Sequence, residues 1–464
     1  ALKAFLSGER ALRSWRLDDA LMSYREAVRI DSSYAMAWYR QSFVQGWSKE
    51  GDGGVLARAM TLRLASQLPP RHALLLTALV ARANGDYATA ERGLLTLVQR
   101  YEDDADPWAE LGEFRMHVGP LLGRPTTNAE APLSRALALD SAGHPEVRYH
   151  LTQLALERGD LARARVLIAP LLPVSSPSDR TVRFFRVMLA MGDGSADPSA
   201  PLRTLREMPA SDVTALLRIG MFSAGVTPLG RALVDSLVAT PDSRDHRRAG
   251  LVLMQEMAIA QRRWSAAIAA GAALAALDSV AAADEWSMLA TAMDAEIPAA
   301  EWRRAGDVLE RAASGDTSAL GWKRRIAAGV LAVRAGDASA YARRLSLLTH
   351  RARQPAWFTT ELHVIRALHA DVARDSLESA RELDAIGPVM ESQLGRWLRA
   401  RSLERSGQLE AASAWYLSAP WGADGLVLTR AALEHASAIA AKRGNMADAD
   451  TFARRAVRFG GGVE

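Results

Sequence analysis

Hydrophobic and small residues recur every three or four positions along most of the chain, which is the spacing of one face of an α-helix. In residues 17–31, for example, Ala20, Tyr24 and Ala27 fall on one face, between charged positions. The alternating pattern of β-strands is almost absent. The pattern therefore predicts an all-α protein made of consecutive helix pairs.

The predicted helices are separated by a recurring short turn that begins with glycine. Glycine readily ends a helix in the left-handed conformation, and Asp or Asn next to it caps the start of the following helix. The first clear example is Gly85-Asp86. The turn returns at Gly159-Asp160, Gly336-Asp337, Gly407-Gln408 and Gly444-Asn445.

Two phrases identify the repeat: "GDYATA" at 85–90 and "WAELGEF" at 108–114. Ala90 precedes Trp108 by 108 − 90 = 18 positions. In phrase and spacing the stretch resembles the tetratricopeptide repeat, a helix-turn-helix unit of about 34 residues. The resemblance implies a right-handed α-solenoid of about ten tetratricopeptide-like helix pairs, each burying its apolar face against its neighbours.

The strength of the repeat signature varies along the chain and predicts its organisation. We expect an N-terminal array at 1–172 with loop insertions at 46–54 and 118–128, degenerate helical repeats or a joint at 173–245, a C-terminal array at 246–459, and a flexible tail at 460–464.

Composition excludes several classes of function. Lys and Arg (57) nearly balance Asp and Glu (53) and alternate with them, so no basic stripe indicates nucleic-acid binding. No stretch approaches the roughly 18 apolar residues of a membrane span. The absence of cysteine excludes disulfides and thiolate metal sites. Abundant Ala and Arg with scarce Lys and Asn indicate a bacterial protein, and the compartment stays open between cytoplasm and periplasm, with peripheral membrane association as an alternative.

The common motifs of phosphate loops, zinc proteases, nucleophile elbows and calcium loops do not occur, so we predict neither an enzyme nor a cofactor. Two histidine pairs, His363/His369 and His144/His150, are each six residues apart and fall on different faces of a helix. The sequence therefore predicts no metal site.

The first helices of successive pairs line the inner curve of such arrays, where peptides or helices bind. Counting from the signature positions places ten residues there: Tyr39, Arg40, Phe43, Trp47, Glu110, Glu113, His117, Tyr149, His150 and Gln153. Some tetratricopeptide domains hold a partner's C-terminal carboxylate with a clamp that contains Asn. Phe43, Glu113 and Gln153 stand where the clamp requires Asn, which disfavours that mode.

The sequence thus favours a non-catalytic scaffold that binds another protein or protein complex and organises an assembly. Two alternatives remain. Residues 1–40 resemble the arrays that follow the kinase domain of some bacterial serine/threonine kinases, which implies a sensory or regulatory region, although the chain has neither a kinase glycine loop nor a His-Arg-Asp triplet. The chain would otherwise be a structural subunit attached to a larger, membrane-embedded complex.

Overall fold

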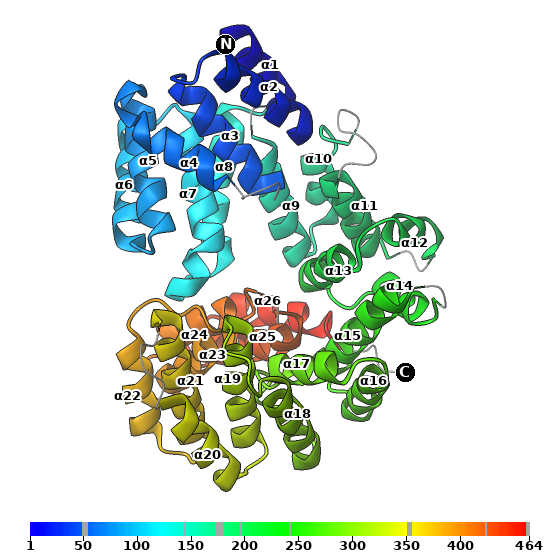
Figure 1. Ribbon diagram of the computed structural model, residues 1–464. Helices are drawn as coiled ribbons and strands as arrows, with labels where there is room; N and C mark the ends of the chain where they lie inside the picture. Colours follow the sequence, from blue (N-terminus) through cyan, green and yellow to red (C-terminus); the bar gives the residue numbers. More distant parts are fainter. Residues whose placement is uncertain are drawn as a thin grey trace. The chain divides into compact units, whose positions relative to one another are not determined.

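The computed structural model describes residues 1–48, 54–142, 144–172, 180–194, 197–240, 243–349, 355–422 and 425–460 (Figure 1). Within these ranges all regular secondary structure is helical and no strand occurs, so the predicted all-α fold of helix pairs is confirmed. None of the described helices is both long and apolar enough to span a membrane.

Two compact units make up the chain. Unit 1 comprises residues 1–118, 126–156 and 160–186, and unit 2 comprises 119–125, 157–159 and 187–464. The α-helices up to residue 168 are α1 (Leu2–Arg13), α2 (Leu17–Ile30), α3 (Ala35–Ser48), α4 (Val55–Arg63), α5 (Pro70–Ala83), α6 (Tyr87–Arg100), α7 (Ala105–His117), α8 (Glu130–Leu139), α9 (Pro145–Arg158) and α10 (Leu161–Ile168). Short 3-10 helices are η1 (Ala65–Gln67), η2 (Gly119–Leu122) and η3 (Thr126–Ala129).

The boundary between the units falls within α11 (Arg180–Gly192). The helices that follow are α12 (Ser199–Arg206), α13 (Ala210–Ala224), α14 (Pro228–Val238), α15 (Arg244–Ala260), α16 (Trp264–Leu277), α17 (Ser279–Leu289), α18 (Ala299–Ala312), α19 (Ala319–Arg334), α20 (Ala338–Thr349), α21 (Ala356–Val372), α22 (Ser376–Ile386), α23 (Gln393–Arg405), α24 (Leu409–Ser418), α25 (Gly425–Lys442) and α26 (Met446–Val457).

Some predicted segments lie wholly or partly outside the described residues. The insertion at 46–54 begins inside α3, and its residues 49–53 are among those outside. The segment 118–128 follows α7 and precedes α8 along the chain, and it includes η2 and part of η3. The start of the predicted joint, 173–179, and most of the predicted tail, 461–464, also lie outside.

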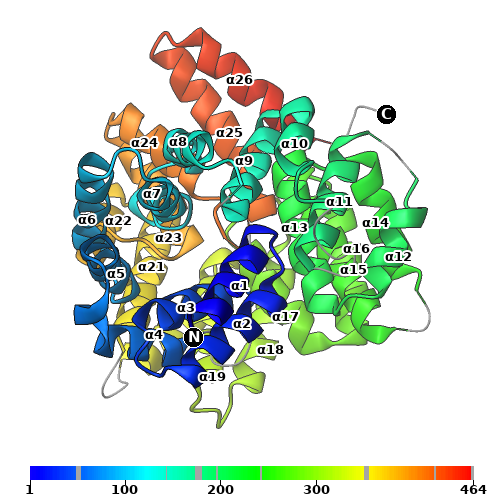
Figure 2. The same cartoon turned by 90° about the horizontal axis from the view of Figure 1, so that it is seen from above.

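The glycine turns have the geometry that their sequence requires. Gly85 has φ of +78°, a left-handed conformation that suits glycine, and the Asp86 N–H bonds back to the Ala81 carbonyl at 2.9 Å. The Asp86 carboxylate then accepts from the Thr89 N–H at 3.0 Å and caps α6. Figures 1 and 2 both show the result, with α5 beside α6. The turn folds each helix back along the one before it.

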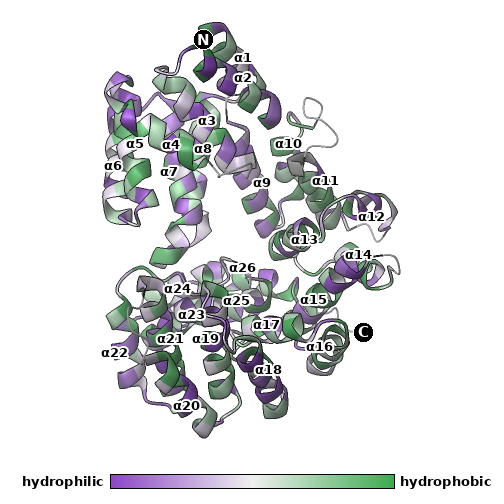
Figure 3. Ribbon diagram, in the orientation of Figure 1, coloured by the Kyte–Doolittle hydropathy of each residue, from purple (hydrophilic) through white to green (hydrophobic). Residues whose placement is uncertain are grey.

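Small residues bring paired helices close together. Ala20 and Ala27 on α2 are fully buried, as predicted, and Tyr24 between them is buried beside α1. A Cβ added at Gly8 of α1 would lie 2.5 Å from the Tyr24 ring, so only glycine fits there. The Tyr24 hydroxyl donates to Glu9 at 2.7 Å, which satisfies its polar end. Figure 3 shows that the helices carry both hydrophobic and hydrophilic residues, as amphipathic packing requires.

The core of unit 2 runs from α15 to α25 and is rich in aromatic contacts. Trp286 and Trp302 pack edge to face at 5.3 Å, and Trp397 and Tyr416 do so at 5.0 Å between ring centroids. Beside this core lies Arg396 of α23, which is only 1% exposed. Its guanidinium is a buried charge that donates to backbone carbonyls.

Candidate functional site

The ten predicted groove residues lie on three helices of unit 1. Helix α3 carries Tyr39, Arg40, Phe43 and Trp47, α7 carries Glu110, Glu113 and His117, and α9 carries Tyr149, His150 and Gln153. The structure divides them between two neighbouring places. Tyr39, Arg40, Phe43 and Glu110 line a pocket, whereas Glu113, His117 and His150 form a separate cluster beside Trp47 and Tyr149.

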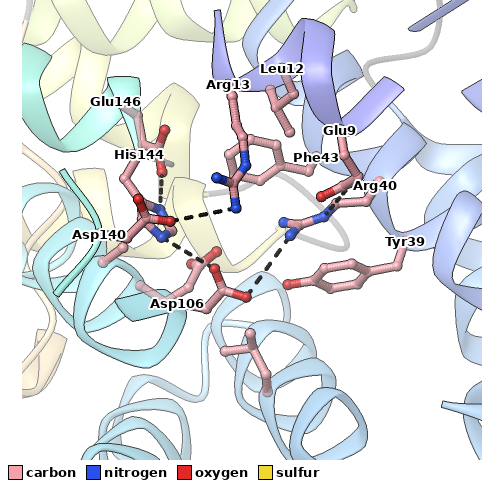
Figure 4. Close-up of a pocket in the computed structure, with 13 residues that line it drawn as sticks. Glu9, Leu12, Arg13, Tyr39, Arg40, Phe43, Asp106, Asp140, His144 and Glu146 are labelled. Atoms are coloured by element: carbon pink, nitrogen blue, oxygen red, sulfur yellow. Dashed lines mark hydrogen bonds and ion pairs between the residues drawn. The ribbon is translucent and has the colours of Figure 1, made fainter. Parts of the chain in front are cut away.

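The pocket, called the acidic pocket below, lies among the first helices of successive pairs (Figure 4). Five carboxylates line it, against two arginines and one histidine. The space left in it is about 60 Å³, room for a few waters or the tip of one side chain. Its charged lining residues are Glu9, Arg13, Arg40, Asp106, Glu110, Asp140, His144 and Glu146.

Most of these charges are paired with one another. Arg40 Nε lies 3.1 Å from Glu9, and its Nη2 lies 3.9 Å from Asp106. On the other side of Asp106, His144 Nε2 approaches the carboxylate at 3.3 Å while His144 Nδ1 lies 2.9 Å from Glu146 (Figure 4). The result is a chain of alternating charges that links α1, α3, α7 and α9.

The pairing shifts the ionisation of the central groups. Burial alone would lower the pKa of His144, but its hydrogen bonds to Asp106 and Glu146 outweigh burial and raise the pKa to about 10. Burial alone would raise the pKa of Asp106, but the hydrogen bond from His144 and the charge of Arg40 hold it well below its usual range. At neutral pH both groups are therefore charged.

Glu110 differs from the other carboxylates of the pocket. It is half-buried and makes no hydrogen bond or ion pair with any residue in the described part of the chain. Burial, together with the nearby charges of Glu113, Glu146 and Asp106, raises the pKa of Glu110 to about 7, although Arg82 acts in the opposite direction. Ionised Glu110 is thus a negative charge that has no hydrogen-bond or ion-pair partner within the described part of the chain.

The second place, called the His–Glu cluster below, consists of Glu113, His117 and His150. Glu113 and His117 are four residues apart on α7 and share a face, with 3.2 Å between Oε2 and Nε2. His150 of α9 approaches the other carboxylate oxygen with its Nε2 at 2.5 Å. Burial alone would raise the pKa of Glu113, but the charge of His150 and the hydrogen bond from His117 hold it well below its usual range.

Burial separates the predicted groove residues that a partner could reach from those that pack inside. Tyr39, His150 and Gln153 are at most 5% exposed, and Glu113 is 9% exposed. Tyr39 packs edge to face against His72 at 5.9 Å. These buried side chains pack inside unit 1, whereas Arg40 and Glu110 are partly exposed in the acidic pocket.

Counting repeat positions missed several residues of the acidic pocket. Asp106 and Glu146 lie in the first turns of α7 and α9, and His144 precedes α9, ahead of the signature positions used for counting. Glu9 and Arg13 come from α1, whose unit has no Trp signature from which to count. An acidic residue in the first turn of two successive first helices is the signal that could have located this pocket.

The geometry of the helix pairs decides the fold class. The left-handed glycine turns, the capping carboxylates and the close contacts at small residues belong to one repeated helix-turn-helix unit. The fold is tetratricopeptide-like. No protein-family profile and no curated protein sequence matches the chain.

Similar solved structures include yeast Tom70, with 12% identity over 99% of this chain and 91% of that chain at a TM-score of 0.36. The Cut9-Hcn1 hetero-tetramer of the APC/C has 10% identity over 98% and 86% of the two chains at a TM-score of 0.27. The tetratricopeptide domain of P58(IPK) has 13% identity over 95% and 98% at a TM-score of 0.22. These similarities concern the fold and say nothing about what this chain binds.

Proposed function

We propose that the protein is a non-catalytic interaction scaffold, and that the acidic pocket of unit 1 receives a Lys or Arg side chain from a partner protein. The observation that carries the proposal is Glu110, a half-buried carboxylate without an ion-pair partner among the described residues. A charged group kept in a pocket without a partner is more readily explained by a ligand than by stability.

The charge and size of the acidic pocket support a basic side chain as the ligand. Five carboxylates line the pocket against two arginines and His144, and Arg71 at 3.4 Å from Asp106 adds a fourth cation, so the pocket attracts positive charge when Glu110 is ionised. A space of about 60 Å³ is far below the roughly 300–1,000 Å³ of small-molecule sites. A Lys ammonium or Arg guanidinium fits a pocket that is both negatively charged and small, because only the charged end of the side chain has to enter it.

The proposal requires that Glu110 costs stability when the pocket is empty. Because its folded pKa of about 7 lies above the usual 4.5, the protein gains stability below about pH 4.5 and loses it as pH rises through 7. Glu110→Gln removes that cost, so we expect it to raise the free energy of unfolding by about 1–2 kcal/mol at pH 8 and by much less near pH 5. Urea unfolding at both pH values measures this.

The matched control is Glu102→Gln, which changes an exposed glutamate of unit 1 outside the pocket. It should leave stability unchanged at either pH. A Glu110→Gln variant that is less stable than wild type at pH 8 would mean that the carboxylate is satisfied in the folded protein, which contradicts the proposal.

Selection from a random displayed-peptide library tests the binding function itself. Immobilised wild-type protein should enrich peptides that share a Lys or Arg at one fixed position, and the same selection on Glu110→Gln should not enrich them. Enrichment on Glu102→Gln should equal that on wild type. Failure to enrich any basic motif, or equal enrichment on Glu110→Gln, would contradict the proposed role of the pocket.

A further inference from the structure

We propose that Glu113, His117 and His150, the His–Glu cluster, bind one divalent transition-metal ion of the zinc class. The site lies outside the acidic pocket and does not depend on the proposed partner. The spacing of residues along a single helix cannot reveal this site, because two ligands come from α7 and the third from α9.

The ligand atoms are already gathered. One nitrogen of each histidine and one carboxylate oxygen all lie within 4.8 Å of one another. Ligands bonded at about 2.0–2.1 Å in tetrahedral geometry are roughly 3.3 Å apart. The 3.2 Å between Glu113 Oε2 and His117 Nε2 fits that value, whereas Glu113 Oε1 and His150 Nε2 lie 2.5 Å apart and must separate for an ion to bind between them.

The polar atoms of the cluster are incompletely satisfied by the protein. His150 is 1% exposed, and among the described residues neither of its ring nitrogens has an aligned hydrogen-bond partner. The same holds for Glu113 Oε1, because its close approach to His150 is not aligned as a hydrogen bond. Buried polar atoms without a partner destabilise the fold, and a metal ion would satisfy His150 Nε2 and Glu113 Oε1 together.

The surroundings suit an ion held at the edge of the fold. The rings of Trp47 and Tyr149 pack against that of His150, with centroids 6.0 Å and 5.1 Å away. The His117 side chain is 37% exposed. An ion could therefore enter past His117 and keep water as its fourth ligand, as three-ligand zinc sites do.

The donor set decides the class of ion. Imidazole nitrogens favour Zn²⁺, Cu²⁺, Ni²⁺, Co²⁺ and Fe²⁺ over Mg²⁺ and Ca²⁺, which prefer all-oxygen sites. Two histidines and one carboxylate leave coordination positions open to solvent or to a ligand. Among the described residues this is the only such group of three, so one equivalent of metal is expected.

The test uses the full-length chain without a histidine tag, stripped with chelator and titrated with Zn²⁺ by calorimetry. We expect one equivalent to bind, and Co²⁺ in its place to give the visible absorption of a tetrahedral complex. Two variants remove ligands with little effect on packing, the isosteric Glu113→Gln and the partly exposed His117→Ala. Each should weaken Zn²⁺ binding at least about 100-fold.

The matched control is His435→Ala in unit 2, which breaks a histidine–glutamate contact of 3.2 Å with Glu404 that has no third ligand. It should bind Zn²⁺ as wild type does. Wild-type protein that fails to bind Zn²⁺ would overturn the proposal. Wild-type affinity in either Glu113→Gln or His117→Ala would also overturn it, because a three-ligand site needs both.

Discussion

Arg396→Met is expected to lower the free energy of unfolding by roughly 3–4 kcal/mol. Arg396 of α23 is 1% exposed and donates to the carbonyls of Met390 at 2.9 Å and Glu391 at 2.7 Å, and also to those of Ala419 and Trp421. It therefore joins the chain before α23 to the chain after α24. Methionine fills similar space but leaves these buried carbonyls without their donors.

Urea unfolding followed by tryptophan fluorescence measures the loss of stability. Trp397 is the next residue in the sequence, and the carbonyl of Trp421 accepts a hydrogen bond from Arg396. The control is Arg343→Met, which changes an exposed arginine of α20 that donates to Ser339. We expect a change within about 0.5 kcal/mol for the control. An equally small change for Arg396→Met would show that the buried guanidinium is dispensable.

The second large effect is expected for His144→Gln, which should lower the free energy of unfolding by roughly 2–3 kcal/mol at pH 6.5. Glutamine keeps polarity but carries no positive charge between Asp106 and Glu146, and it leaves Asp106 with Arg71 at 3.4 Å and Arg40 at 3.9 Å as its cations. Half-buried Asp106 and buried Glu146 then lose their shared counter-charge.

The pH dependence of this effect has a definite sign. The folded pKa of His144, about 10, lies above the usual 6.5, so its stabilisation is complete below about pH 6.5 and is lost as pH rises through 10. The difference between wild type and His144→Gln should therefore shrink by more than half between pH 6.5 and pH 10.5. Asp106→Asn combined with His144→Gln should cost less than the sum of the single changes. A difference that is constant with pH, or strict additivity, would contradict the charge network.

The sequence predicted those parts of the fold that local chemistry controls. Gly85 and Asp86 specify a helix stop and a helix start by themselves, and the spacing of Ala20, Tyr24 and Ala27 defines the buried face of α2. These features depend only on residues a few positions away. They can therefore be predicted from the sequence without knowledge of any tertiary contact.

The candidate sites were predicted only in part, because they depend on contacts between helices. Repeat counting places Arg40 and Glu110 on first helices of their pairs, and both residues line the acidic pocket. The charge partners of Arg40 are Glu9 on α1 and Asp106 in the first turn of α7, and that counting covers neither position. The His–Glu cluster was missed for a related reason: histidines were compared within one helix, whereas His117 and His150 belong to two.

The functional account depends most on Glu110 as the receptor of a basic side chain. The decisive measurement is the dissociation constant of one library-selected basic peptide, by fluorescence anisotropy at pH 8, for wild type, Glu110→Gln and Glu102→Gln. We predict binding at least about 10-fold weaker for Glu110→Gln and unchanged for Glu102→Gln, since a buried charge pair contributes more than about 1.4 kcal/mol. Equal affinity of all three proteins would contradict the account.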